Sequence, residues 1–254
     1  MKRIVFLAST NYTGKSHALR GCCNDAYAMK RKFESLGVDD IPMLLGTDMT
    51  TKNWKDCLTE LVLDCNEGDV LIHHHSHHGA QIKDSLESDG LAEVWCPDDF
   101  NWNPSNMITD DWMSELLWTN LPKGVRYVDI ADCCHAGDSL RCLNLYMADE
   151  TAKFIPNPEV LKMKGQEVIL RITGHHSGIQ MAACRSGQTS ADAFIENQYC
   201  GAFTYYFLKA WDQLQNPFYN QLVDRTAYLL AENHFEQIPE LDCLNDVSTI
   251  EFLK

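Results

Sequence analysis

Two short stretches of the sequence place a histidine or a cysteine next to a glycine, a combination that suits nucleophilic catalysis. Residues 76–79 read Ser-His-His-Gly, and residues 132–137 read Asp-Cys-Cys-His-Ala-Gly. The attacking species of a cysteine is its thiolate, so a histidine that takes or shares the proton must lie within reach. A glycine lets the backbone bend so that N–H groups can point at a developing oxyanion. The two stretches therefore offer an imidazole and a thiol for one catalytic pair.

The elements around these stretches would bring them together. Short apolar runs predict strands at residues 4–8, 41–45, 69–75, 125–132 and 180–184. Apolar residues at helical spacing predict helices at residues 24–36, 51–65, 110–118, 203–214 and 220–232. This alternation predicts an α/β fold with a central, mostly parallel sheet of about six strands and helices on both faces. Both stretches follow predicted strands, and working residues gather at the carboxyl ends of such strands.

Composition narrows the class of protein. The chain has 254 residues, 21 Lys and Arg against 36 Asp and Glu, and a formal charge of −15. This acidic balance argues against a non-specific nucleic-acid or anionic-membrane binder. No apolar run approaches the length that crosses a bilayer. Eleven cysteines without a Cys-x-x-Cys pair indicate reduced thiols, so we expect a cytoplasmic protein.

One domain over residues 1–254 is the simplest organisation. Two segments lack clear periodicity and are predicted to be long loops, at residues 79–107 and 138–176. Loops of this length inside a compact domain are usually functional.

Three ordered motifs resemble those of the metacaspases, a family of caspase-like cysteine peptidases. Residues 21–26, Gly-Cys-Cys-Asn-Asp-Ala, resemble the family's Gly-Cys-x-Asn-Asp-Ala. Residues 76–79 resemble its Ser-Gly-His-Gly, with His77 in place of glycine, and residues 132–137 resemble its Asp-Ser-Cys-His-Ser-Gly. The resemblance implies a caspase-like fold and an endopeptidase that acts through a thioester acyl-enzyme. His78 would be the catalytic imidazole and Cys134 the nucleophile, with the backbone N–H groups of Gly79 and Cys134 as the oxyanion hole.

The resemblance also implies a substrate. In metacaspases an acidic pocket accepts arginine or lysine before the cut, and the matching positions here are Cys22, Asp25, Ser76 and Asp132. Two carboxylates facing a cation give charge-assisted hydrogen bonds. We therefore expect a protein or peptide substrate with Arg or Lys before the cut. The basic residues of segment 138–176, among them Lys153, suggest self-cleavage there.

Calcium is a further expectation from the family. Several metacaspases are activated by calcium held by aspartates, and the candidate ligands here are Asp89, Glu93, Asp110 and Asp111. Asp110 and Asp111 have an equally good structural interpretation, because acidic residues favour the first turn of a helix. No cofactor is required for the chemistry itself.

Several alternatives stay open. Cys133 could replace Cys134 as nucleophile and His135 could replace His78 as base, although the motif register favours Cys134 and His78. The histidine run at residues 73–78 invites a zinc hypothesis, including a metal-dependent hydrolase, but a polar strand explains it more simply. A catalytically silent caspase-like scaffold that binds a partner protein is the main alternative function. By analogy with the family we expect a monomer.

Overall fold

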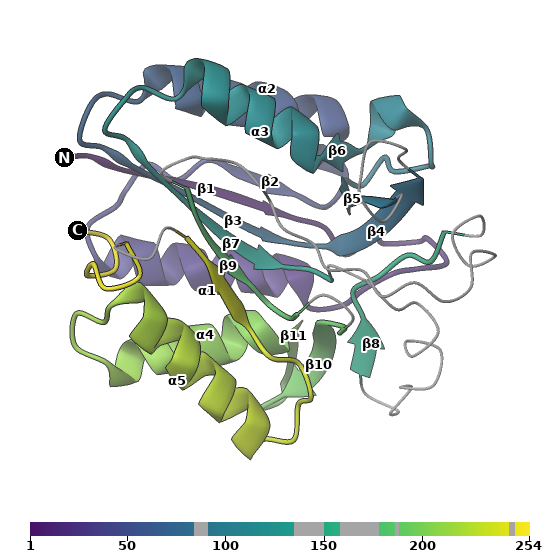
Figure 1. Cartoon of the computed structure of the whole chain (residues 1–254). Helices are drawn as coiled ribbons and strands as arrows, with labels where there is room; N and C mark the ends of the chain where they lie inside the picture. Colours follow the sequence, from purple (N-terminus) through teal and green to yellow (C-terminus); the bar gives the residue numbers. More distant parts are fainter. Residues whose placement is uncertain (84–90, 135–149, 158–177, 186–187, 244–246) are drawn as a thin grey trace.

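Six strands form the central sheet of the computed structural model, which describes residues 1–83, 91–134, 150–157, 178–185, 188–243 and 247–254. Across the sheet the order is β12-β9-β7-β3-β1-β2, and only β12 runs antiparallel to its neighbour. The strands are β1 (Arg3–Ser9), β2 (Met43–Leu45), β3 (Val70–Ser76), β7 (Arg126–Asp132), β9 (Gly178–Ala182) and β12 (Glu240–Asp242). The predicted mostly parallel α/β sheet is confirmed (Figure 1).

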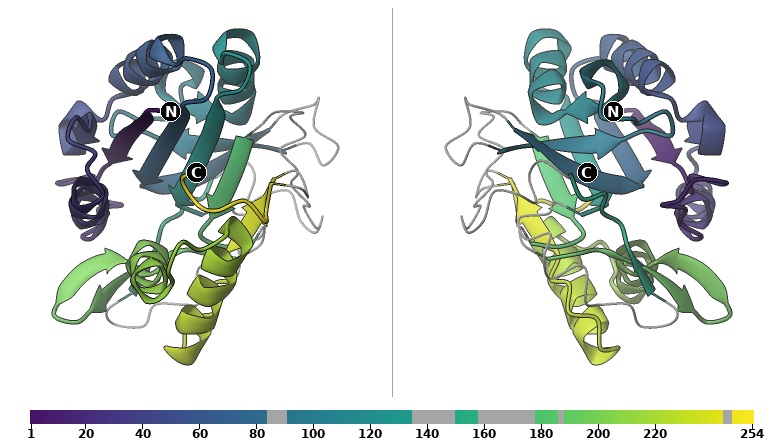
Figure 2. Two further views of the ribbon diagram at one scale, coloured as in Figure 1. Left: turned by 90° about the vertical axis from the view of Figure 1, so that its left-hand side faces the viewer. Right: turned by 90° about the vertical axis from the view of Figure 1, so that its right-hand side faces the viewer.

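Helices cover both faces of this sheet, as predicted. One face carries α1 (Cys22–Ser35), α4 (Ala202–Gln213) and α5 (Tyr219–Glu232), and the other carries α2 (Thr51–Asp64) and α3 (Asp110–Asn120). In views turned by 90°, the sheet lies between these two helical layers (Figure 2). Each layer buries its own core, with Phe33, Phe203 and Phe207 on the first face and Trp54 and Leu58 on the second. Burying each such side chain contributes about 1.5–3 kcal/mol.

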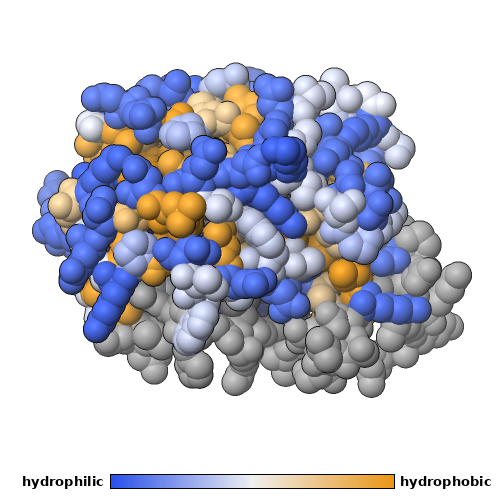
Figure 3. Space-filling model, turned by 90° about the horizontal axis from the view of Figure 1, so that it is seen from above, coloured by the Kyte–Doolittle hydropathy of each residue, from blue (hydrophilic) through white to orange (hydrophobic). Residues whose placement is uncertain are grey.

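The outward surface of the α2 and α3 layer is mostly hydrophilic, with apolar patches between the polar side chains (Figure 3). Both helices are therefore amphipathic, because their inner sides pack on the sheet. Among the described residues, each helix is too short or too polar to cross a membrane.

Two central strands determine what lies on each face at the carboxyl edge of the sheet. β3 and β7 are parallel neighbours, with Ser76 opposite Asp132 and His73 opposite Asp129. Successive side chains of a strand point to opposite faces. Ser76 and Asp132 therefore face the α1 and α4 layer, whereas His73 and Asp129 face the α2 and α3 layer.

The loop predicted at residues 79–107 is a wrong prediction, because much of it is a second, three-stranded sheet. That sheet comprises β4 (His78–Lys83), β5 (Leu91–Cys96) and β6 (Ile108–Thr109), with a 3-10 turn at Pro104–Asn106. In β5, Leu91, Val94 and Trp95 are buried, so an apolar strand follows directly on the acidic residues that suggested a loop.

A third small sheet was also not predicted. It consists of β8 (Glu150–Ala152), β10 (Ala191–Ile195) and β11 (Gln198–Gly201). β8 falls within the predicted loop at 138–176, and residues 153–157 follow it. The rest of that segment lies outside the described residues.

Candidate active site

The structure brings together the residues that were predicted to form an acidic pocket. These residues, all buried, are Cys22, Asp25, Ser76 and Asp132. Asp25 lies in the first turn of α1, where its Oδ2 accepts a hydrogen bond from Ser76 Oγ at 2.7 Å and its Oδ1 accepts one from Gly201 N at 2.8 Å. The start of α1, the end of β3 and the start of α4 therefore meet at this point.

Asp132 at the end of β7 is held by three hydrogen bonds. Its Oδ2 accepts from Thr204 N at 3.0 Å and from Thr204 Oγ1 at 2.6 Å, and its Oδ1 accepts from Ser190 Oγ at 2.7 Å. A buried carboxylate is costly unless it is paired and hydrogen-bonded. These bonds satisfy part of that requirement and fix the direction of the carboxylate.

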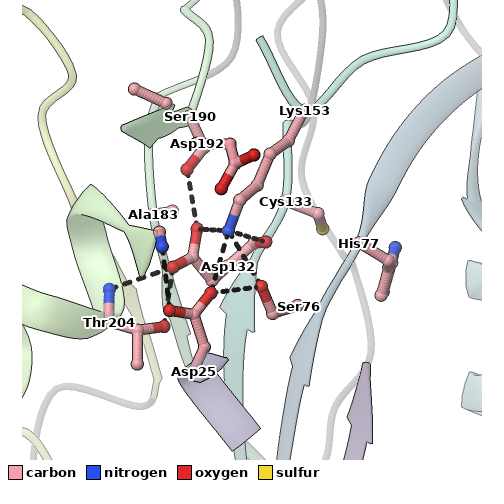
Figure 4. Close-up of polar contacts among 12 residues, drawn as sticks. Asp25, Ser76, His77, Asp132, Cys133, Lys153, Ala183, Ser190, Asp192 and Thr204 are labelled. Carbon is pink, nitrogen blue, oxygen red and sulfur yellow. Dashed lines mark hydrogen bonds and ion pairs between the residues drawn. The ribbon is translucent and has the colours of Figure 1, made fainter. Parts of the chain in front are cut away.

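The cation that pairs with both carboxylates is Lys153, which follows β8. Its Nζ lies 2.9 Å from Asp132 Oδ1 and 3.3 Å from Asp25 Oδ2, and it donates to Ser76 Oγ at 2.8 Å (Figure 4). The lysine side chain is completely buried. From the sequence, Lys153 was expected to be a basic residue of a cleavable segment, and not the group that fills the pocket.

Burial and charge shift the pKa values of this group. Burial raises the pKa of Asp25 to about 7, although the Lys153 ammonium acts in the opposite direction. For Asp132, burial alone would raise the pKa, but Lys153 and the bonds from Thr204 and Ser190 hold it below its usual value. Burial would lower the pKa of Lys153, but the facing carboxylates raise it well above its usual value. The lysine is therefore protonated, and Asp132 is its principal counterion.

The main-chain carbonyl of Lys153 also has two donors. Its oxygen accepts hydrogen bonds from Gly79 N at 3.0 Å and Cys134 N at 3.3 Å. Two backbone N–H groups on one carbonyl oxygen are the arrangement of an oxyanion hole. A Cβ at position 79 would lie 1.9 Å from the carbonyl oxygen of Cys134, so only glycine allows this approach.

The chain around Lys153 is bound as an extended strand. β8 pairs antiparallel with β10, with Ala152 opposite Ala191, and Lys153 N donates to Ser190 O at 3.0 Å. Beyond Lys153, Ile155 N donates to Gly79 O at 3.0 Å. Strand addition of this kind is a common way for a protein to bind a peptide.

Asn157 extends the same attachment, because its Nδ2 donates to Gln81 O at 2.9 Å. Residues on both sides of Lys153 are therefore tied to strands at the carboxyl edge of the central sheet.

Cys134 lies beside the peptide bond that follows Lys153. Cys134 and Phe154 form a small buried cluster, and Cys134 Sγ accepts a hydrogen bond from Ser190 N at 3.0 Å. Cys134 therefore meets both residues of the Lys153–Phe154 bond, its side chain packing with Phe154 and its backbone N–H donating to the Lys153 carbonyl oxygen.

His78 is oriented by residues near the N-terminus. Its Nε2 lies 2.7 Å from the carbonyl oxygen of His17 and therefore donates to it, and its backbone N donates to Tyr12 Oη at 3.0 Å. Burial lowers the pKa of His78 to about 3, so the ring is neutral. Its Nδ1 is then unprotonated, and it is buried without a hydrogen bond of normal geometry to any described residue. Such an atom can take a proton.

The remaining predicted residues have different surroundings. Asp110 and Asp111 begin α3, where Asp111 N donates to Asp110 Oδ1 at 3.0 Å, and Glu93 lies in β5 opposite Gln81. Among the described residues, the groups of three potential ligands within 4.8 Å do not include these acids. Asp89 and the alternative base His135 lie outside the described residues. Calcium binding by Asp89, Glu93, Asp110 and Asp111 therefore stays a prediction.

Several residues that hold the site could not be recognised from the sequence. Ser190 and His17 act through backbone or hydroxyl groups in segments without a motif. Thr204 follows a Gly-Ala-Phe sequence that resembles the family only weakly, and this was the sole signal for it.

These features define a cysteine peptidase of the caspase type, and comparison with known proteins agrees. Residues 2–143, more than half of the chain, match the family model described as "Metacaspase, peptidase C14 domain". The chain therefore belongs to the metacaspase family and is a cysteine-type peptidase, a hydrolase.

Two curated relatives illustrate the extent of the match. Metacaspase-1 of Schizosaccharomyces pombe is 28% identical over 291 residues, covering 95% of this chain and 67% of the relative. Metacaspase-3 of Trypanosoma brucei brucei is 29% identical over 251 residues, covering 91% and 68%. The chain thus spans about two thirds of the length of these relatives.

Two crystal structures show the fold. Protein GSU0716 from Geobacter sulfurreducens superposes with a TM-score of 0.72 at 19% identity, over 99% of this chain and 97% of the other. Caspase-1 from Spodoptera frugiperda superposes with a TM-score of 0.61 at 11% identity, over 95% and 86%. The fold is therefore caspase-like.

Proposed function

We propose that this peptidase cleaves after lysine or arginine, that His78 and Cys134 are its catalytic pair, and that its first substrate is its own Lys153–Phe154 bond. The observation that carries the proposal is the double placement of Lys153. Its ammonium lies between Asp25 and Asp132 while its carbonyl oxygen lies between the N–H groups of Gly79 and Cys134.

The pocket supports a basic residue before the cut. It presents two buried carboxylates and one hydroxyl, and a neutral side chain would leave those carboxylates without a cation. Leaving a buried charge unpaired costs several kcal/mol. An arginine would satisfy both carboxylates with its fork of N–H donors, as lysine does with its ammonium.

The proposed reaction uses these groups in the following order. Cys134 Sγ, as thiolate, attacks the carbonyl carbon of Lys153, and the oxygen that becomes negative stays bonded to the N–H groups of Gly79 and Cys134. His78, which has taken the thiol proton, gives it to the amide nitrogen of Phe154, and the C–N bond breaks. A thioester on Cys134 and a free amine on Phe154 result. Water then hydrolyses the thioester, regenerates the thiol and leaves the Lys153 carboxylate.

Self-cleavage is tested by intact mass and N-terminal sequencing after incubation of the purified chain. We expect a fragment that begins at Phe154 from the parent chain and from Lys153→Arg, and no such fragment from Lys153→Met or Cys134→Ala. Lys153→Met is the matched control, because methionine keeps a long, flexible side chain without charge. An uncut parent chain that nevertheless cleaves lysine peptides would mean that Lys153 leaves the pocket without being cut, and it would overturn the proposed self-cleavage.

Cleavage of other substrates is tested with paired fluorogenic peptides that end in lysine, arginine or aspartate. We expect cleavage after lysine and arginine, none after aspartate, and none by Cys134→Ala. Arms with and without calcium measure whether the ion activates the enzyme. No cleavage in any arm, together with no labelling of Cys134 by an electrophilic peptide, would favour the silent scaffold.

A further inference from the structure

A second cluster of reactive side chains lies directly behind the catalytic pair, on the α2 and α3 face of the sheet. It consists of His75, His77 and Cys133, which are buried and whose ligand atoms lie within 4.8 Å of one another. Figure 4 shows the Cys133 sulfur on the side of His77, away from the carboxylates and Lys153. The proposed peptidase chemistry uses none of these three side chains.

The hydrogen bonds of His77 assign its tautomer. Its Nδ1 lies 2.7 Å from the carbonyl oxygen of His78, which can only accept, so Nδ1 carries the hydrogen. In this tautomer the other ring nitrogen, Nε2, carries no hydrogen. Its Nε2 therefore holds a lone pair, and this lone pair faces His75 Nδ1 at 2.8 Å.

His75 presents a second lone pair to the same point. Its Nε2 lies 3.3 Å from Asp129 Oδ2 and 3.2 Å from Asp129 Oδ1. That carboxylate also accepts from Tyr127 Oη at 3.2 Å and from Gln180 Nε2 at 3.1 Å, so it acts as an acceptor throughout. His75 Nε2 is then the nitrogen that carries the hydrogen, so Nδ1 is the nitrogen that faces His77 Nε2. Two ring nitrogens whose hydrogens lie on their far sides need a cation between them at 2.8 Å, and a metal ion can supply it.

A neighbouring group of three potential ligands, His73, His75 and Asp129, is a poorer candidate. His73 Nε2 accepts a hydrogen bond from Trp54 Nε1 at 3.1 Å, so its Nδ1 carries the hydrogen, with Tyr127 Oη at 2.9 Å and Asp129 Oδ1 at 3.1 Å as the nearby acceptors. His73 therefore has no lone pair left for a metal. The tautomers select His75, His77 and Cys133 as ligands and leave Asp129 as the group that orients His75.

We propose that His75 Nδ1, His77 Nε2 and Cys133 Sγ bind a thiophilic transition-metal ion of the zinc class. Two imidazoles and a thiolate suit zinc and cobalt, and they exclude calcium and magnesium, which prefer oxygen ligands. Tetrahedral bonds of about 2.0–2.3 Å place the ligand atoms about 3.3–3.6 Å apart, so the two rings would separate by roughly 0.5 Å. Both rings already donate their other N–H to an oxygen, which is the usual support for a metal-binding histidine.

Binding replaces protons by the metal in a balanced way. The ion takes the place of the thiol proton of Cys133 and of any second proton on His75, and these protons are released to solvent. Three protein ligands leave one tetrahedral position for water. The ion would join the ends of β3 and β7 directly behind His78 and Cys134, because each catalytic residue is bonded to a ligand residue.

The test uses cobalt as the probe and Cys134→Ala as the parent, so that neither self-cleavage nor the nucleophile contributes. The chain is produced without a polyhistidine tag, with cobalt supplied during folding under anaerobic conditions, and is then dialysed. We expect about one cobalt per chain by elemental analysis and a thiolate-to-cobalt charge-transfer band. The expected loss in Cys133→Ser and in His77→Phe is more than tenfold in retained cobalt, because each removes one ligand. His77→Phe keeps a ring of similar size against Trp54.

Cys57→Ser is the matched control, because Cys57 lies on α2 and belongs to neither group of potential ligands among the described residues, so the band should stay unchanged. A band that persists in Cys133→Ser would overturn the proposal. Absence of bound cobalt in the parent chain would also overturn it, whatever the variants do. Failure of the proposed peptide cleavage would not affect either result, because the parent chain lacks the nucleophile.

Discussion

The ends of β3 and β7 present different side chains to the two faces of the sheet. On the α1 and α4 face these are Ser76 and Asp132. On the opposite face they are the neighbouring residues His75, His77 and Cys133. The first face carries buried carboxylates, and the ammonium of Lys153 from the same chain pairs with them. The second face collects neutral nitrogen and sulfur donors, and none of the described residues brings a lysine or arginine to it in an ion pair.

The difference shows how strand alternation lets one sheet edge serve two chemistries. In the proposed peptidase the pocket releases its cation so that a substrate residue can enter, and the cation that fills the pocket here is a lysine ammonium. A cluster of soft donors is suited to a cation that stays. The backbone joins the two faces at the peptide bonds on either side of Ser76 and at the bond from Asp132 to Cys133.

The largest expected effect is the difference in cleavage and labelling between variants of the two adjacent cysteines, one on each face. Cys134→Ala should lower cleavage of lysine peptides by at least about 10³-fold and abolish covalent labelling by a lysyl electrophile. Cys133→Ser should still be labelled, because its side chain belongs to the other face. Labelling followed by peptide mapping checks both variants, and a label on Cys133 would reverse their assignment.

Removing one carboxylate of the pocket should have the next largest effect. Asp132→Asn should lower kcat/KM for lysine peptides by about 10²–10³-fold, since a charge-assisted pair is lost. It should also lower the free energy of unfolding of the uncut chain by about 3–5 kcal/mol, because Lys153 loses its principal counterion while buried. Chemical denaturation measures the second quantity. Adding Lys153→Met should recover much of the lost stability; equal stability of the single and double variants would contradict the pairing.

A smaller change tests the shape of the pocket without changing its charge. A Cβ at position 201 would lie 2.3 Å from Lys153 Nζ and 2.1 Å from Asp132 Oδ2, while the backbone φ of −66° suits alanine. Gly201→Ala should therefore reduce cleavage of lysine peptides by about 10²-fold. Gly178→Ala is the control, because its Cβ would meet only Tyr127 at 3.9 Å. Unchanged KM and kcat in Gly201→Ala would mean that the basic residue binds elsewhere.

The smallest expected effect is a pH dependence that only the carboxylate face should show. The pKa of Asp25 is raised to about 7, chiefly by burial, so this group is largely neutral at pH 6 and ionised at pH 8. Ionisation adds a negative charge beside the bound cation, so KM for a lysine peptide should fall up to about tenfold as pH rises through 7. A peptide with norleucine in place of lysine should show no such fall. Asp25→Asn should remove the difference between the two peptides.

The central part of this arrangement was predictable from sequence because its signals are local. Apolar runs marked β3 and β7, and the motifs at their ends marked His78 and Cys134. Lys153 could not be placed in the same way, because its position depends on the pairing of Ala152 with Ala191, far along the chain. The β4 and β5 pair was missed because an acidic stretch separates its two short strands, and sequence periodicity is weak in strands of this length.

Alternation along a strand could have separated the two faces, but it could not identify which histidines have free lone pairs. That distinction depends on donors such as Trp54 and acceptors such as the carbonyl of His78, which only the folded structure brings to the rings.

The attachment of Ile155 to Gly79 has a consequence for the timing of the proposed self-cleavage. After the C–N bond breaks, the new amine of Phe154 is still held beside the thioester by Ile155 and by the bond from Asn157 to Gln81. A well-oriented tethered nucleophile acts at effective concentrations of about 10⁵–10⁸ M, far above that of water. Attack of this amine on the thioester, which re-forms the peptide bond, is therefore faster than hydrolysis until the strand leaves β4. The rate of the proposed self-cleavage is therefore set by release of this strand from β4, because cleavage of the peptide bond stays reversible until then.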